Sequence, residues 1–203
     1  MEPSTAYANL GEERIAYQII GDGPVDIVVT AGWWSPFDID WEEPSIRAFY
    51  LRVARFARVI RGMGVSDPSP LDALPPWESL SDEIMAVMDA VGSERAFVLA
   101  AGTAGPAAAL FAASHPDRTA GLILAHTTVR YGWDEDYPFG LTADEQAAWI
   151  ETATENWGGA SNALLEMTFP SRASDPADSI PAVFDARGVY RRLEIRADNV
   201  ESL

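Results

Sequence analysis

The stretch Val98–Pro106, with the sequence VLAAGTAGP, constrains the fold more than any other part of this 203-residue chain. Its first residues are typical of a buried strand, and its small residues lead directly into the Ala-rich segment Ala104–Ser114, which predicts a helix. A strand that passes abruptly into a helix is half of a strand–helix–strand unit. We therefore predict an α/β protein with a mostly parallel sheet flanked by helices.

Strands and helices are expected to alternate along the first 130 residues. The turn residues Gly21–Pro24 between the first two strands favour a hairpin. We interpret residues 1–130 as the core domain. The expected strands are Arg14–Ile20, Val25–Thr30, Arg58–Ile60, Arg95–Ala101 and Gly121–Ala125, and the expected helices are Pro44–Ala57, Ser79–Val91 and Ala104–Ser114.

Residues 131–203 have a different character, because they contain no further segment rich in β-branched residues. Thr142–Trp157 predicts a helix, with Thr142 as the N-cap and Glu145 completing a capping box. Ser161–Phe169 is a second expected helix. We interpret this part of the chain as a partial helical cap followed by a tail.

The composition excludes several classes of function. The formal charge is −17 and the 14 basic residues are all Arg, which argues against a nucleic-acid surface and excludes lysine chemistry. Without cysteine there are no disulfides or thiolate sites. The acidic groups Glu12–Glu13, Glu42–Glu43 and Asp134–Asp136 lack metal-loop spacing, so we expect no metal and no cofactor.

Neither a membrane span nor a secretory signal is expected. The chain has no run of about 20 apolar residues, and the N-terminal segment Met1–Thr5 is polar and acidic. We therefore expect a cytoplasmic protein with no membrane partner.

The order of elements resembles that of an α/β-hydrolase. Several local sequences are similar to one bacterial subfamily, the hydrolase-like domain fused to class III adenylyl or guanylyl cyclases, and the resemblance runs from about Tyr7 to Ala177. It implies an α/β-hydrolase fold with an esterase-like function, a partial cap and missing C-terminal strands. The stretches that carry it are Ala16–Pro24, Gly32–Ser35, Trp41–Pro44, Arg61–Asp67, Val87–Gly92 and Asp136–Gly140.

The resemblance places the catalytic serine of such enzymes at position 102, fourteen residues before Pro116, and this chain has Gly102 there. It also places the acid and the histidine of the triad beyond the given sequence. We therefore predict a pseudoenzyme rather than a competent serine hydrolase. Thr103 and His126 are the remaining candidates for catalytic groups, whereas the other histidine, His115, is expected to cap the end of a helix.

The same resemblance implies an oxyanion hole formed by the backbone N–H groups of Trp33 and Thr103. A pocket for a small hydrophobic ester or carboxylate would be lined by Gly32, Trp33, Trp34 and Trp133. The alternative is that the tryptophans only pack, and that Gly102 and Gly105 only permit a close approach of helix and sheet.

Three functional hypotheses stay open. The chain is an impaired relative of the carboxylic-ester hydrolases, a non-catalytic ligand-sensing or interaction module associated with a cyclase or another partner chain, or a degenerate fragment that folds poorly. The strand Gly121–Ala125 is expected at an exposed sheet edge, where a homodimer, a partner chain or the tail segment Val189–Ile195 would cover it.

Overall fold

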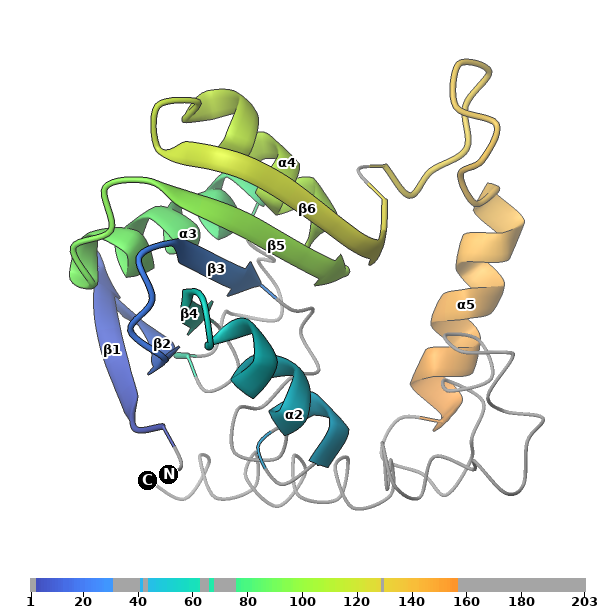
Figure 1. The fold of residues 1–203 in the computed structure, drawn as a ribbon. Coiled ribbons are helices and arrows are strands. Elements are labelled where there is room, and N and C mark those ends of the chain that lie inside the picture. Colours follow the sequence, from blue (N-terminus) through green and yellow to red (C-terminus); the bar gives the residue numbers. More distant parts are fainter. Residues whose placement is uncertain are drawn as a thin grey trace. The chain divides into compact units, whose positions relative to one another are not determined.

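The computed structural model describes residues 3–30, 41, 44–62, 66–67, 76–128 and 130–156 (Figure 1). The chain divides into two compact units, Met1–Arg130 and Tyr131–Leu203. The described part of the first unit contains a six-stranded sheet and three helices. The strands are β1 (Thr5–Leu10), β2 (Glu13–Ile20), β3 (Asp26–Thr30), β4 (Arg58–Gly62), β5 (Ala96–Gly102) and β6 (Thr119–Thr127), and the helices are α2 (Pro44–Val53), α3 (Trp77–Ala90) and α4 (Gly105–Ser114).

The sheet has the strand order β1-β2-β4-β3-β5-β6. The pairs β4–β3, β3–β5 and β5–β6 are parallel, whereas β1–β2 and β2–β4 are antiparallel. Helices separate β3 from β4, β4 from β5 and β5 from β6 along the chain. The predicted α/β class with a mostly parallel sheet is confirmed.

The predicted hairpin between β2 and β3 is wrong, because β4 lies between these strands. The segment Gly21–Pro24 instead packs against the residues that follow the end of α2. A Cβ built on Gly23 would lie 2.5 Å from the backbone carbonyl carbon of Phe56, so a residue without a side chain is needed there. The hairpin connects β1 to β2 at Gly11, whose φ is +63°. The sequence pattern does not predict β1.

Strand β4 is longer than the predicted Arg58–Ile60. Arg61 and Gly62 extend it because they pair with Val29 and Thr30 of β3 on one side and with β2 on the other. All five residues of β4 therefore have a partner on β3, and the strand is as long as β3 itself.

The hydrophobic core has one part on each face of the sheet. On the face covered by α3 and α4, Val28 and Val98 pack with Phe111 of α4. On the other face, Val29 packs with Tyr50 of α2. Since side chains alternate along a strand, the nearly continuous apolar sequence of β3 supplies both parts of the core.

The described part of the second unit contains one helix, α5 (Ala143–Asn156). Its capping box is confirmed: the carboxylate of Glu145 accepts a 2.8 Å hydrogen bond from the N–H of Thr142, and the Thr142 hydroxyl accepts one from the N–H of Glu145 at 3.3 Å. The hydrogen bonds that the carboxylate accepts from the N–H and from the hydroxyl of Thr142 lower the pKa of Glu145. The second expected helix, Ser161–Phe169, lies outside the described residues.

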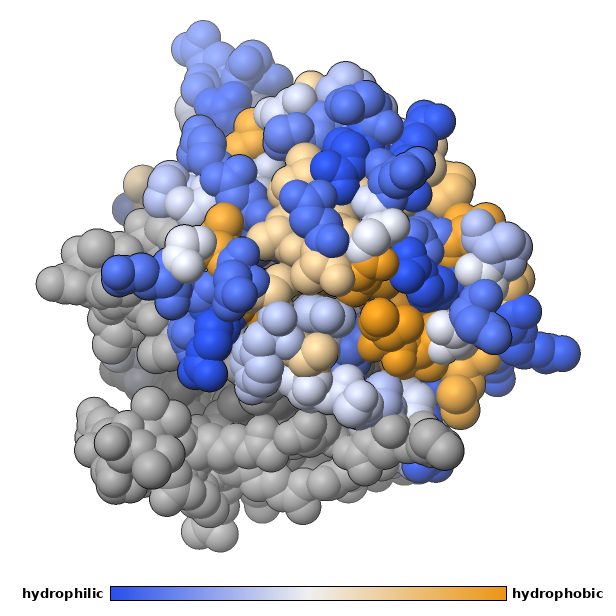
Figure 2. All heavy atoms as spheres, turned by 90° about the vertical axis from the view of Figure 1, so that its left-hand side faces the viewer, coloured by the Kyte–Doolittle hydropathy of each residue, from blue (hydrophilic) through white to orange (hydrophobic). Residues whose placement is uncertain are grey.

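The face of the molecule drawn in Figure 2 is hydrophilic over much of its area, with hydrophobic side chains gathered towards one side. Among the described residues, no helix combines the length and apolar character needed to cross a bilayer.

Candidate functional site

The turn between β5 and α4 is the centre of the candidate site. Strand β5 ends at Gly102, whose φ of +59° lies in the left-handed region, and α4 begins three residues later at Gly105. An L-residue with a side chain pays about 1–2 kcal/mol for this backbone conformation, whereas glycine adopts it freely. The sharp strand-to-helix turn that the resemblance implies is present, and position 102 has no side chain to project from it.

Helix α4 starts in close contact with the segment that ends β6. A Cβ built on Gly105 would collide with the side chain of Thr127 and would lie 2.5 Å from the carbonyl oxygen of Thr128. The Thr127 hydroxyl also donates a hydrogen bond to the carbonyl oxygen of Gly102. The end of β6 therefore contacts both the turn and the first residue of the helix.

His126 lies beside this turn on a bulge in β6. Ala101 pairs with Ala125 and Gly102 pairs with Thr127, so His126 is the extra residue between the two pairs. Its φ is +48° and its side chain is exposed. Bulges of this kind redirect a side chain at the end of a strand. No local sequence signal predicts this one.

Thr103 follows Gly102 directly and is half-buried. Among the described residues, neither its N–H nor its hydroxyl has a hydrogen-bond partner. It lies near the start of α4, where backbone N–H groups point towards an approaching anion.

The other predicted site residues are only partly visible. Gly32, Trp33 and Trp34 lie outside the described residues, so the second oxyanion donor and most of the pocket lining stay predictions. Trp133 belongs to the second unit, where its side chain is 49% exposed and its N–H donates a 2.9 Å hydrogen bond to the carbonyl oxygen of Leu141.

His115 occupies the opposite end of α4 from Gly102. Its N–H donates a 2.8 Å hydrogen bond to the carbonyl oxygen of Phe111, and the two rings are 5.1 Å apart between centroids. The position of His115 at the helix end is as expected, but its ring contacts an aromatic side chain of its own helix.

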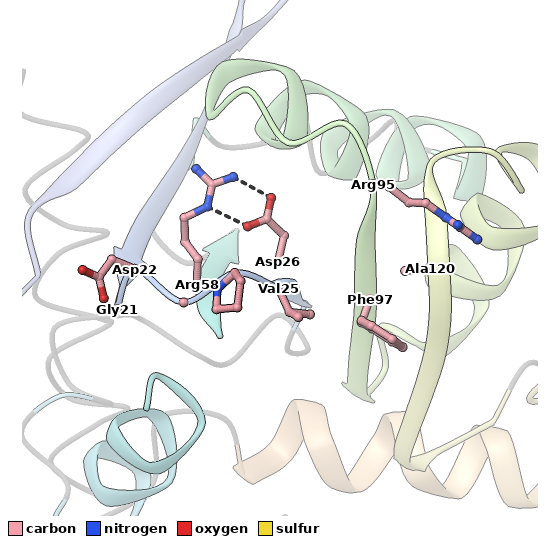
Figure 3. Close-up of a pocket in the computed structure, with 10 residues that line it drawn as sticks. Gly21, Asp22, Val25, Asp26, Arg58, Arg95, Phe97 and Ala120 are labelled. Carbon is pink, nitrogen blue, oxygen red and sulfur yellow. Dashed lines mark hydrogen bonds and ion pairs between the residues drawn. The ribbon is translucent and has the colours of Figure 1, made fainter. Parts of the chain in front are cut away.

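A depression of about 610 Å³ lies at the amino-terminal ends of the parallel strands, whereas the β5–α4 turn lies at their carboxyl ends (Figure 3). Arg58 and Asp26 form a bidentate ion pair there, with N–O distances of 2.6 and 2.5 Å. The hydrogen bonds from Arg58 hold the pKa of Asp26 below its usual value. Ligands of open α/β sheets bind at the carboxyl ends of the strands, so we interpret this pair as structural.

Glu83 of α3 is a titratable group that the sequence analysis missed. Burial raises its pKa to about 7, with a further contribution from the nearby charge of Glu13. Its side chain lines a small apolar cavity beside Val29 and Thr30, the last residues of β3. Its sequence position gave one signal, since it lies among the apolar positions Leu80, Ile84 and Val87 of the helix.

The described residues contain no group of three side chains able to hold a metal ion.

No family model matches this chain, and no curated protein matches its sequence. Solved structures do match. A mutant of an epoxide hydrolase from Vigna radiata superposes with a TM-score of 0.54 at 13% identity, covering 75% of this chain and 46% of its own. A CIB-like hydrolase from Thermoplasma acidophilum has a TM-score of 0.50 at 16% identity, covering 75% of this chain and 81% of its own.

A bacterial membrane phospholipase A, described as a virulence factor, also matches, with a TM-score of 0.50 at 22% identity over 61% of this chain and 39% of its own. At these identities the likeness defines the fold, which is the α/β-hydrolase fold. The chain spans less than half the length of the phospholipase and of the Vigna epoxide hydrolase.

Proposed function

We propose that this chain is a non-catalytic α/β-hydrolase-fold module that binds a small apolar ester or carboxylate at the β5–α4 turn. The observation that carries the proposal is Gly102. The backbone at position 102 is left-handed, and this position has no side-chain oxygen to attack a carbonyl carbon.

Binding without turnover is supported by the features around that glycine. Thr103 has a backbone N–H without a partner among the described residues, at the start of a ten-residue helix. Such a donor stabilises a carboxylate as well as it stabilises the oxyanion of a reacting ester. Without a nucleophile the donor contributes to binding only.

In this proposal a partner chain binds the ligand-bound form and the ligand-free form of the module with different affinities. The resemblance to domains that precede class III cyclases makes a nucleotide cyclase the class of partner to test first. The test adds the purified chain to a class III cyclase, with and without butyrate, and measures the cyclase activity. A change in activity that depends on butyrate would support a cyclase as the partner.

The test compares turnover with binding in one preparation. We expect p-nitrophenyl acetate and butyrate to be hydrolysed no faster than with heat-denatured protein, and tryptophan fluorescence to change saturably when butyrate is added. Thr103→Ala keeps the backbone N–H and is expected to keep binding. Saturable ester hydrolysis that disappears in Thr103→Ala would overturn the proposal, as would the absence of any saturable binding across the ester and carboxylate series.

A further inference from the structure

Strand β6 lies at an edge of the described sheet and lacks the usual protection of an edge. Its nine residues, TAGLILAHT, include no Asp, Glu, Arg or Pro. Natural edge strands carry such residues or are short, because an edge presents unpaired backbone N–H and C=O groups to other chains. Among the described residues, β5 is the one strand that pairs with β6, so the backbone groups on the outer side of β6 have no strand partner there.

Both faces of β6 expose large apolar side chains. Leu122 and Leu124 are 36% and 44% exposed, although the residues beside them on β5, Val98 and Ala100, are fully buried. On the opposite face, Ile123 is 42% exposed. The surface of this strand is therefore apolar on both sides of the sheet.

The other edge of the sheet is better covered. Strand β1 is shorter, with six residues, and it packs against α3. The guanidinium of Arg14 lies 5.3 Å from the centre of the Tyr7 ring on this strand. An added strand would therefore bury more exposed apolar surface at β6 than at β1.

We propose that β6 pairs with β6 of a second copy of this chain, antiparallel about a two-fold axis at Ile123. This register places Leu122 beside Leu124 of the second copy, on the face of the sheet that carries α4. Ile123 lies beside its own counterpart on the face that carries α2. The exposed apolar groups of the two copies then cover one another, and both outer edges of the continuous sheet are β1.

The charges at the two ends of β6 favour this antiparallel arrangement. Asp117 precedes the strand and is exposed, and Arg130 follows it in the sequence. The two-fold axis brings Asp117 of each copy to the end of the pair where the other copy continues to Arg130, whereas a parallel pairing would bring like charges together. Because β6 carries no Asp, Glu or Arg, the net charge of −17 places no like charges in the contact.

A symmetric contact of this kind also closes on itself. Each copy uses its β6 edge once, so the pairing removes the exposed edge and forms no open fibre. The tail segment Val189–Ile195, which is also expected at this edge, lies outside the described residues. If that segment or a different protein covers β6 instead, the purified chain is monomeric. The inference does not depend on the proposed function.

Thiol cross-linking tests the register in the full chain, which has no native cysteine. We expect Ile123→Cys to give covalent dimers with a short bifunctional thiol reagent, because the two thiols face each other at the axis. The matched control is Ala125→Cys, which is exposed on the same face. Its two copies lie about 14 Å apart at the rise of a strand, so it should cross-link at least tenfold less. Equal yields, or no covalent dimer from Ile123→Cys, would overturn the proposal.

Light scattering provides a second measurement that needs no cysteine. We expect the unmodified chain to have twice the mass of one chain, and Leu122→Glu to have the mass of one chain, because it places a charge in the apolar contact. Tyr7→Glu changes an exposed residue at the other edge and should stay dimeric. Circular dichroism checks that both variants fold like the unmodified chain. A monomeric unmodified chain, or a folded Leu122→Glu variant that stays dimeric, would overturn the proposal.

Discussion

Gly102 and His126 both have a left-handed backbone and lie at the same level of adjacent strands, with φ of +59° and +48°. The turn after β5 and the bulge in β6 are thus neighbours. The hydrogen bond from the Thr127 hydroxyl to the Gly102 carbonyl oxygen joins them. The turn after β5 and the bulge in β6 therefore shape the candidate site. Substitutions of Gly102, Gly105 and Thr127 should change the free energy of unfolding.

Gly102→Ala should destabilise the protein by about 1–2 kcal/mol, the cost of a side chain in the left-handed region. Gly11→Ala is the matched control, since its φ is +63° and a Cβ there would meet nothing within 4 Å. Urea unfolding of the two variants compares the β5–α4 turn with a hairpin turn that has the same backbone conformation and open space around it. A cost at Gly102 of less than half that at Gly11 would contradict the left-handed backbone conformation of the β5–α4 turn.

Thr127→Val should cost about 1 kcal/mol, because it removes the hydroxyl that donates to Gly102 while keeping the shape of the side chain. Thr127→Ser keeps the donor and should recover most of the loss. Urea unfolding measures the free energy of unfolding of both variants. Equal values for Thr127→Val and Thr127→Ser would show that the hydrogen bond contributes nothing to stability.

Gly105→Ala should destabilise by about 1–3 kcal/mol through overpacking, because the added methyl group meets the backbone of Thr128 and the side chain of Thr127. The control is Gly132→Ala, where the nearest atom to a Cβ is 3.6 Å away. Thermal unfolding followed by circular dichroism provides the comparison. An unchanged midpoint for Gly105→Ala would refute the close approach of α4 to β6.

Glu83→Gln should stabilise the protein at alkaline pH. The folded chain holds the Glu83 proton with a pKa of about 7, above the ordinary 4.5. Stability from this group is therefore full below about pH 4.5 and declines as the pH rises through 7. At pH 8 the glutamine variant should gain on the order of 2 kcal/mol over the unmodified chain, and at pH 4.5 almost nothing.

Asp82→Asn is the control for this pH dependence, because Asp82 is exposed on the same helix. Its effect should stay within about 0.5 kcal/mol at both pH values. Urea titrations at pH 4.5 and pH 8 measure both variants. A gain for Glu83→Gln that is the same at the two pH values would contradict the raised pKa of Glu83.

Much of the fold could be predicted from local patterns. The helices α3, α4 and α5 follow the apolar spacing, the small-residue run and the capping box, and β3, β5 and β6 follow their β-branched and aliphatic sequences. These signals arise within single elements, where side-chain periodicity and capping chemistry act over a few residues.

The misses involve relationships between distant segments. The insertion of β4 between β2 and β3 depends on partners some 40 residues away, while the turn residues at Gly21 imitate a hairpin. The bulge at His126 lies where the start of α4 approaches the end of β6, and the half-buried carboxyl of Glu83 faces strand residues that are distant from it in the sequence. Such features depend on tertiary packing.

The central position of β3 has a consequence for synthesis on the ribosome. This strand pairs only with β4 and β5, so both of its edges lack backbone partners until residues 58–62 and then 96–102 have left the exit tunnel. Until then Val28 and Val29 belong to an unpaired apolar segment of the nascent chain. The translation of about seventy residues therefore separates the emergence of β3 from the completion of its pairing, and this interval is where a chaperone would protect the chain most.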